Sequence, residues 1–303
     1  MKIISADWLV ICDENNSIIQ NGAVVFTDKI QEVDTLNNIE KKYPNIEIEK
    51  LAKNSVLMPG LINSHIHLEF SGNTTTLKYG NFYSWLNSVI KHREDLISKA
   101  NTKLILSKLS KMKRTGTTTI GAISSYSFDL DTCVKSPLNK VFFCEVIGTK
   151  GDMIDTLFAD FKDRLNIAKK YKSANFIPAI AIHSPYSVHP FLVRETLKLA
   201  REENLPVTSH FLESREEFEW LHKDEGAFVE FFKNFLGQEQ SVTKPMEFLN
   251  LFSNIKNLSF THCVEASSAD FDKIKLLGAS VNHCVTSNRL LNNTKLDLEK
   301  LKD

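Results

Sequence analysis

The sequence lacks the features that mark several classes of protein. It has no run of lysine and arginine, and its 37 basic residues equal its 37 acidic ones, so nothing favours nucleic acid or an anionic membrane surface as a partner. It has no apolar run long enough to span a bilayer. Its first residues include an early acid, Asp7, and no apolar block before a cleavage site, so they predict no signal peptide. We therefore expect a small-molecule partner, and neither nucleic acid nor membrane.

Cysteine is also scarce. The five cysteines are odd in number and scattered, mostly within apolar runs typical of strands: Cys12, Cys133, Cys144, Cys263 and Cys284. This pattern favours reduced, buried thiols over disulfides or a thiolate zinc site. We therefore expect a cytoplasmic location.

Apolar residues make up 42% of the chain, enough for a large core. They follow two different patterns in two parts of the sequence. Residues 1–58 consist of short segments rich in β-branched residues and separated by turns. We expect a small β domain here, the N-terminal part of a β-sandwich. Its predicted strands are Ile3–Ile11, Ile18–Phe26, Lys29–Val33 and Ile46–Leu51.

Residues 59–303 alternate apolar strands with amphipathic stretches. The predicted strands are Leu61–His67, Thr117–Ile123, Val141–Ile147, Ile177–His183, Val207–Phe211, Leu258–His262 and Ala279–Cys284. The predicted helical segments are Asp95–Lys113, Met153–Tyr171, Phe191–Glu203 and Ser267–Leu276. Repeated alternation of this kind favours parallel βαβ units and a (β/α) barrel over an open sheet.

The first of these strands delivers two histidines, His65 and His67, spaced one residue apart. Alternate side chains of a strand share a face, so both imidazoles point the same way. Two imidazoles on one face at a strand end make half of a metal site. A strand end with two hydrogen-bonded histidines would show the same pattern.

Other predicted strands also end in histidine, and the ends of parallel barrel strands meet at one mouth. His210 could complete a three-histidine site that leaves a position open for water, which is the catalytic arrangement for zinc. Glu213 would then lie beside that water and carry protons. A glutamate that caps the following helix is an equally good interpretation of Glu213.

Two further strand-end histidines, His183 and His262, have more than one interpretation. His262 could hydrogen-bond a bound water or a substrate nitrogen. His183 could face the mouth, or it could be a core histidine bonded to a backbone carbonyl. We interpret His283 as structural, and Asn288 as a residue that shapes the pocket or holds its loop.

Five motifs occur in order along the chain, at Pro59–His67, His183–Tyr186, His210–Glu213, Thr261–Cys263 and Cys284–Leu291. Together they resemble the amidohydrolase superfamily, in particular its branch of aminohydrolases that act on purines, cytosine and triazines. The resemblance runs from the N-terminal β domain to the last residue. It implies an α/β fold, a TIM-type (β/α)8 barrel with a small N-terminal β-sandwich domain.

The resemblance also implies a reaction. His65, His67 and His210 would bind one divalent ion, zinc in the first place with iron or nickel as alternatives, and the ion would convert water to hydroxide. That hydroxide would attack C6 of an adenine ring, and ammonia would leave. Glu213 would act as the general acid and base, and His262 would position the hydroxide.

Several less general stretches indicate the substrate. They are similar to the members of this branch that deaminate 6-aminodeoxyfutalosine, an adenine nucleoside derivative of menaquinone biosynthesis, and they lie at Tyr79–Leu86, Gly121–Ser124, Ser136–Asn139 and Glu216–Trp220. Deamination of S-adenosylhomocysteine or methylthioadenosine and dechlorination of a triazine are the alternative reactions.

The same resemblance implies residues that contact the substrate. His183 and Asn288 would line its pocket, and Glu69, two residues beyond His67, would reach the ribose hydroxyls. A cation should face the benzoate group that this substrate carries. Arg215 and Arg289 are the candidates for that cation.

One part of the family pattern is missing. Members complete the metal site with an aspartate at the end of an eighth strand, and no such strand is predicted here. Asp297 and Asp303 belong to a helix-like segment and are poor substitutes. We therefore expect a truncated product, one chain of a split protein or an incomplete sequence, and a non-catalytic metal-binding protein is the second class of function. Exposed barrel edges promote association, and a homodimer would cover them.

Overall fold

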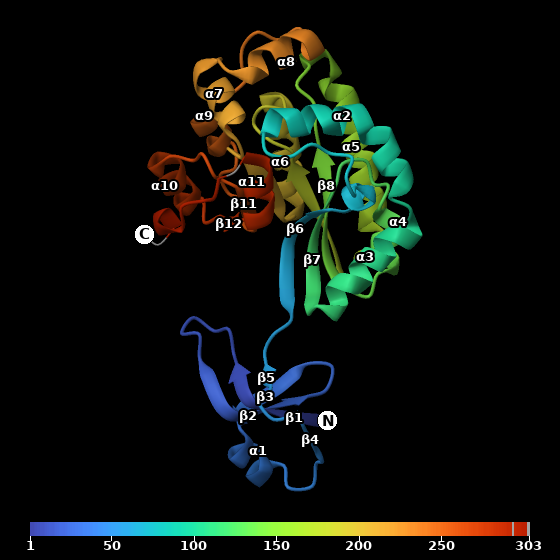
Figure 1. Cartoon of the computed structure of the whole chain (residues 1–303), viewed down its shortest axis with the longest axis vertical. Helices are drawn as coiled ribbons and strands as arrows, with labels where there is room; N and C mark the ends of the chain where they lie inside the picture. Colours follow the sequence, from blue (N-terminus) through green and yellow to red (C-terminus); the bar gives the residue numbers. More distant parts are fainter. Residues whose placement is uncertain (293, 302–303) are drawn as a thin grey trace. The chain divides into compact units, whose positions relative to one another are not determined.

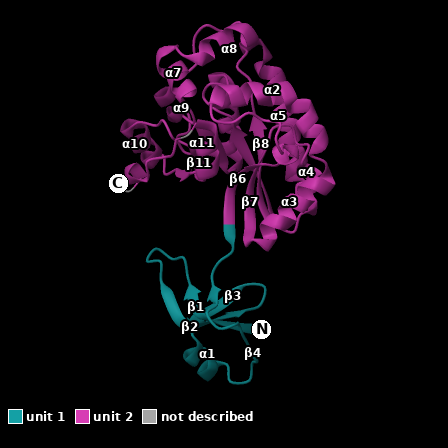
Figure 2. Cartoon of the chain, in the orientation of Figure 1, with its two compact units in different colours: residues 1–61 teal, residues 62–303 magenta. Residues whose placement is uncertain are grey.

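The computed structural model describes residues 1–292 and 294–301. The chain divides into two compact units, Met1–Leu61 and Ile62–Asp303 (Figures 1 and 2). Each unit has buried apolar clusters of its own, which is the usual mark of a separate domain.

The first unit is a small mixed sheet with one helix. Its elements are β1 (Lys2–Val10), β2 (Ile18–Phe26), β3 (Ile30–Thr35), α1 (Leu36–Lys42), β4 (Ile48–Lys50) and β5 (Val56–Leu57). The strand order is β3-β2-β1-β4, and β5 also pairs with β1. Ile3, Ala23 and Val25 pack against Ile39 of α1. The first three predicted strands are confirmed, whereas α1 and β5 were not predicted, and the β-sandwich stays a prediction.

The second unit contains a parallel sheet of seven strands that forms a nearly closed barrel. The strands are β6 (Leu61–His67), β7 (Thr117–Ser124), β8 (Asn139–Val146), β9 (Phe176–Ile182), β10 (Val207–Phe211), β11 (Leu258–His262) and β12 (Ser280–Asn282). They follow one another in chain order from β6 to β12. Nearly continuous apolar runs such as β9 are typical of strands covered on both faces. The predicted (β/α) barrel strands are confirmed.

Helices connect these strands and lie outside the sheet (Figure 1). They are η1 (Leu68–Gly72), α2 (Phe82–Lys99), α3 (Thr102–Arg114), α4 (Leu130–Lys135), η2 (Gly151–Met153), α5 (Ile154–Lys169), α6 (Pro190–Glu203), α7 (Arg215–Lys223), α8 (Ala227–Leu236), α9 (Pro245–Asn250), α10 (Ser268–Leu276), α11 (Val285–Asn292) and η3 (Leu298–Leu301).

The single helical segment predicted at Asp95–Lys113 is wrong, because the stretch contains the end of α2 and most of α3. The break has a local cause. The Asn101 side chain accepts the N–H of Leu104 at 3.1 Å, which is the hydrogen bond of an N-cap and starts a new helix.

The sequence also led to expectations about membrane spans and about the cysteines. Within the described ranges no helix is long and apolar enough to traverse a bilayer. All five cysteines are free, and Cys133, Cys144 and Cys263 are buried. Burial raises the pKa of the Cys144 thiol to about 12, so this thiol is inert near neutral pH.

Gly121 marks a close approach of β7 to β6 beside the first histidine. A Cβ atom at this position would lie 2.1 Å from the carbonyl oxygen of Ser64.

Because neither backbone can move without disturbing the strand pairing, Gly121→Ala should lower the free energy of unfolding by about 2 to 3 kcal/mol. Gly151→Ala is the matched control, since its added Cβ would meet only His189, at 4.0 Å. Urea unfolding of both variants measures the difference, and equal stabilities would contradict the described packing.

Candidate metal and catalytic centre

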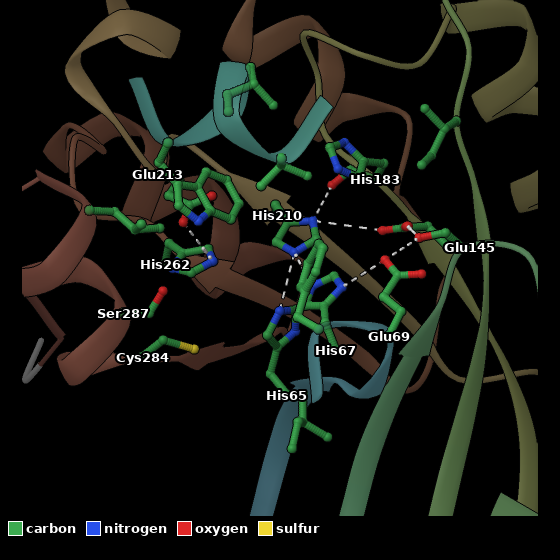
Figure 3. A pocket seen from close by; sticks show the side chains of 18 of the residues that line it. His65, His67, Glu69, Glu145, His183, His210, Glu213, His262, Cys284 and Ser287 are labelled. Atoms are coloured by element: carbon green, nitrogen blue, oxygen red, sulfur yellow. Dashed lines mark hydrogen bonds and ion pairs between the residues drawn. The ribbon is translucent and has the colours of Figure 1, made fainter. Parts of the chain in front are cut away.

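Three histidines from distant parts of the chain meet at the carboxyl ends of the barrel strands (Figure 3). His65 and His67 lie on β6, and His210 lies on β10. The Nε2 atom of His210 is 3.2 Å from the Nε2 atom of His65 and 3.2 Å from that of His67. The structure therefore brings together the three residues that the sequence suggested as ligands.

The hydrogen bonds of His210 test whether this set fits a metal ion. Its Nδ1 atom donates to the carbonyl of His183 at 2.6 Å, so its Nε2 atom carries a lone pair. One lone pair accepts one hydrogen bond, yet two imidazole nitrogens approach it. The two nitrogens compete for that lone pair, and a cation between the rings would satisfy all of these nitrogens. Tetrahedral zinc with bonds of about 2.0–2.1 Å sets ligand nitrogens roughly 3.3 Å apart, which matches the separation of His210 from each of the other two rings.

The protonation states of these histidines suit ligands. Burial lowers the pKa of His65 and of His210 well below the usual value, and the neighbouring histidines add to this. His67 differs: burial lowers its pKa, but the carboxylates of Glu69 and Glu145 more than offset that and raise it. Metal binding would displace a proton from such an imidazole.

Among the described residues, two sets of three side chains have ligand atoms that all lie close together, and His67 belongs to neither set. His65, His210 and His262 have one donor atom each within 4.8 Å of one another, and so do Glu145, His183 and His210. His210 can join only one of these sets, because only its Nε2 atom is available. The two contacts of 3.2 Å direct that atom towards β6.

Glu213 and His262 form a proton-sharing pair at the edge of this cluster. The His262 Nε2 atom is 3.3 Å from Glu213 Oε1. The His262 Nδ1 atom donates to the Asn288 side-chain oxygen at 2.7 Å, and the Asn288 amide nitrogen donates to His283 Nδ1 at 3.1 Å. With its proton on Nδ1, the His262 ring presents Nε2 as an acceptor, so the Glu213 carboxyl group is the donor.

Burial leads to the same assignment of the proton. It raises the pKa of Glu213 well above the usual range, and the nearby Glu217 carboxylate adds to this rise. It lowers the pKa of His262 to about 4, against the opposing effect of the hydrogen bond with Asn288. Burial therefore favours the protonated carboxyl group of Glu213 and the neutral imidazole of His262. This pair can give a proton to a bound molecule and take one back.

Glu217 holds the loop that carries Glu213. Its carboxylate accepts the N–H of Leu212 at 3.1 Å and the N–H of Glu213 at 2.8 Å. Ser214 caps α7 by accepting the N–H of Glu217 at 3.2 Å, so the helix cap is Ser214 and the Glu213 side chain faces His262 instead.

The loops after β10 and β11 are strained where they present these groups. Leu212, His262 and Cys263 have φ angles of 46°, 75° and 50°. A side chain in this left-handed region costs on the order of 1–3 kcal/mol. The N–H of Cys263 donates to the carbonyl of Phe211 at 2.9 Å, which ties one loop to the other and holds the strained backbone in place.

The histidines open into a cavity of about 400 Å³. One wall is apolar and comes from η1 and α2, through Phe70, Trp85, Leu86, Val89 and Ile90. His183 and Glu69 line the cavity as the sequence suggested. Asn288 is fully buried, and its hydrogen bond with His262 makes it a support for that ring.

The polar residues of the cavity that were not predicted include Arg93, Ser125 and Glu145. Glu145 is the next-to-last residue of β8 and Ser125 follows β7 directly. Both obey the rule that identified the histidines, because they are polar residues at the carboxyl ends of barrel strands. Arg93 lies on α2, and no sequence pattern distinguishes it from other surface arginines.

The arginines suggested as the cation for the substrate and the aspartates considered as metal ligands are not among the described residues that line the cavity. Arg215 donates to Glu219 at 2.9 Å, whereas Arg93 is the arginine among the residues that line the cavity. Arg289 is exposed on α11. Asp297 is exposed before η3, and Asp303 lies outside the described residues.

A parallel (β/α) barrel with converging histidines and a buried carboxyl group at its mouth is the architecture of a metal-dependent hydrolase. The sequence profile of the amidohydrolase family matches residues 56–303. The chain belongs to the amidohydrolase family, and the resemblance seen in its motifs is confirmed.

Individual relatives agree with this assignment. Aminodeoxyfutalosine deaminase of a Nitratiruptor species is 47% identical over 286 residues, which cover 94% of this chain and 70% of the relative. Adenosine deaminase of Helicobacter pylori is 32% identical over 309 residues, 100% of this chain and 74% of the relative. The crystal structure of Helicobacter pylori aminofutalosine deaminase in complex with methylthio-coformycin matches with a TM-score of 0.93 at 30% identity, covering 100% of this chain and 74% of that one.

A divalent ion should stabilise the folded chain through the three histidines. We expect zinc to raise the Tm of metal-free protein, because the ion binds the folded state. Loss of a residue that only supports a metal ligand weakens metal binding roughly 10- to 100-fold. His210→Ala removes a ligand itself, so it should weaken zinc binding by more than this. The control is His222→Ala, an exposed histidine of α7. Thermal unfolding with metal analysis measures both, and zinc binding by His210→Ala that equals wild type would refute the assignment.

Glu217 should make stability depend on pH. Burial raises its pKa from 4.5 to about 7, against two backbone hydrogen bonds that lower it. The folded state therefore holds a proton that the unfolded state releases, and the stability this contributes is lost as pH rises towards 7. Relative to Glu217→Gln, wild type should lose on the order of 3 kcal/mol between about pH 4.5 and 7. Parallel urea titrations with Glu230→Gln as control test this, and a constant difference across pH would contradict it.

Proposed function

We propose that the chain is a hydrolytic deaminase of an adenine nucleoside derivative, with 6-aminodeoxyfutalosine as its preferred substrate. The observation that carries the proposal is the Glu213–His262 pair, 3.3 Å apart, beside three converging imidazoles. Replacement of an amino group by water needs a proton donor at a ring nitrogen and an activated water. The relative that is 47% identical, named aminodeoxyfutalosine deaminase, supports the choice of substrate.

The proposed ligands are His65, His67 and His210. A divalent ion bound there, zinc with iron or nickel as alternatives, would supply a Lewis acid that makes water a nucleophile near neutral pH. Every other part of the reaction can be assigned to side chains of the chain itself.

Glu213 is the proposed general acid and base. Its buried carboxyl group would donate its proton to the ring nitrogen next to C6 as water adds at C6. The resulting carboxylate would take one proton from the added water and give it to the amino group, so that ammonia leaves, and it would take the second proton as the C6 carbonyl forms. His262 would position the attacking water, because Asn288 keeps the proton of its ring on Nδ1 and leaves Nε2 as an acceptor.

The proposed substrate contacts are His183 and Glu69. The Nδ1 atom of His183 lies 2.5 Å from the hydroxyl of Ser187, which fixes the ring and leaves Nε2 for the substrate. Glu69 is 7% exposed and is the proposed partner of ribose hydroxyls. The apolar wall formed by Trp85, Leu86 and Val89 offers a flat surface for a purine ring.

A cytoplasmic location, a β-sandwich in the first unit, a domain boundary between residues 58 and 59 and a homodimer are proposals as well. The five free cysteines support the first of them, because thiols stay reduced in the cytoplasm.

Replacement of the general acid should separate binding from chemistry. We expect Glu213→Gln to lower kcat for 6-aminodeoxyfutalosine by roughly 10²- to 10⁴-fold with little change in KM, because the amide keeps the shape and loses the transferable proton. Glu230→Gln, an exposed glutamate of α8, is the control. Absorbance change during deamination measures both in zinc-loaded protein. Full activity of Glu213→Gln, or hydrolysis of a triazine with no turnover of adenine nucleosides, would refute the proposal.

A further inference from the structure

Helix α11 turns one face towards the site. Ser287 lines the cavity (Figure 3), and so does Leu291. Asn288, between them, is fully buried. These positions and Asn292 follow the spacing of three and four residues that places side chains on one face of a helix. The face therefore carries two amide side chains, Asn288 and Asn292, one helical turn apart.

Each amide holds one member of the Glu213–His262 pair. The Asn288 side-chain oxygen accepts the proton of His262 Nδ1 at 2.7 Å. The Asn292 side-chain nitrogen donates to the backbone carbonyl of Glu213 at 3.0 Å. Four residues rise about 6 Å along a helix, and that rise is fixed by the backbone hydrogen bonds. Because both partners are bonded to one rigid element, α11 fixes the backbone of Glu213 relative to the ring of His262.

The backbone of Glu213 is held on both sides. Its N–H donates to the Glu217 carboxylate of α7 at 2.8 Å, and its carbonyl accepts from Asn292 of α11. The preceding residue, Leu212, has a φ angle of 46°, a conformation that persists only where its surroundings hold it. With both backbone groups bonded, only the side-chain torsions of Glu213 remain to set its distance from His262.

A third segment anchors α11 itself. The N–H of Gly80 donates to the carbonyl of Leu290 at 2.7 Å, and the φ angle of Gly80 is 95°, which favours glycine. The next residue, Asn81, donates to Glu216 of α7 at 2.8 Å. The segment before α2 is thus bonded to both helices that hold Glu213, and neither helix can shift alone.

We propose that Asn292 is a positioning residue for Glu213, which it holds at the distance from His262 that proton transfer needs. This inference rests on the proposed function and deepens it. Asn292 is half-buried and is not among the described residues that line the cavity, so it acts through the backbone of Glu213 and not on the substrate. A catalytic group misplaced by about 1 Å can cost on the order of 10²-fold in rate.

The other role for Asn292 is purely structural, a link between α11 and the loop after β10. In that role its loss would lower stability and would change turnover by the same factor whether or not Glu213 can transfer a proton. A positioning role predicts a different result, because the effect of Asn292 then depends on the acid that it positions.

The first test compares two equivalent substitutions. Asn292→Leu keeps a branched side chain and removes the donor, and Asn250→Leu makes the same change at an exposed position of α9. In zinc-loaded protein, Asn292→Leu should lower kcat for 6-aminodeoxyfutalosine roughly 10- to 100-fold. Its KM and zinc content should equal those of wild type, because Asn292 touches neither the substrate nor a proposed ligand. Asn250→Leu should keep the wild-type kcat.

The second test repeats Asn292→Leu in the Glu213→Gln background. The group at position 213 no longer transfers a proton there, so Asn292→Leu should change the residual kcat less than threefold. A crystal structure of Asn292→Leu provides a readout without turnover. It should show Glu213 Oε1 farther from His262 Nε2 than the 3.3 Å of the wild-type chain.

An equal loss of kcat in both backgrounds would assign Asn292 a structural role and overturn the proposal. Wild-type kcat in Asn292→Leu, a raised KM with unchanged kcat, or loss of zinc from that variant would overturn it as well. If Asn292→Leu does not fold, Asn292→Ala opens space instead of filling it and enters the same comparison with the same expectations. A wild-type protein that deaminates no adenine nucleoside would contradict the proposed function itself.

Discussion

The site depends on one constraint, the lone pair on the Nε2 atom of His210. The carbonyl of His183 holds the proton of this ring on Nδ1, and two more imidazoles lie 3.2 Å from the remaining nitrogen. Parallel strands can produce this arrangement because their carboxyl ends all point to one mouth. A positive ion between the rings would satisfy these nitrogens at the same time.

Burial links the metal ligands to the acid. The environment that lowers the pKa of His65 and His210 also raises that of Glu213, because both effects come from removing charge from water. The same apolar surroundings therefore favour neutral imidazoles and a protonated carboxyl group. The proton remains available because His262, held by Asn288, presents an acceptor to it.

The sequence predicted the parts of this structure that depend on periodicity. Apolar strands alternating with helices predicted the barrel, and strand ends with histidine predicted where the three rings would meet. The prediction failed where the choice of a helix-capping side chain decides the structure. The break between α2 and α3 depends on a cap at Asn101, and the choice between Ser214 and Glu213 as the cap of α7 depends on which side chain turns towards the helix.

Polar residues of the cavity were missed for two reasons. Glu145 sits in an apolar strand, where its position near the carboxyl end could have identified it as readily as a histidine. Arg93 looks like any arginine on an amphipathic helix, and it reaches the cavity through the packing of α2 against η1. Contacts between elements that are distant in sequence have no local signature, so Arg93 could not be predicted from periodicity.

The most direct test of the account is anomalous diffraction at the zinc edge from crystals of zinc-loaded protein. We predict one strong peak within about 2.0–2.1 Å of the Nε2 atoms of His65, His67 and His210. A peak between Glu145 and His183, or no peak near the three rings, would contradict the account.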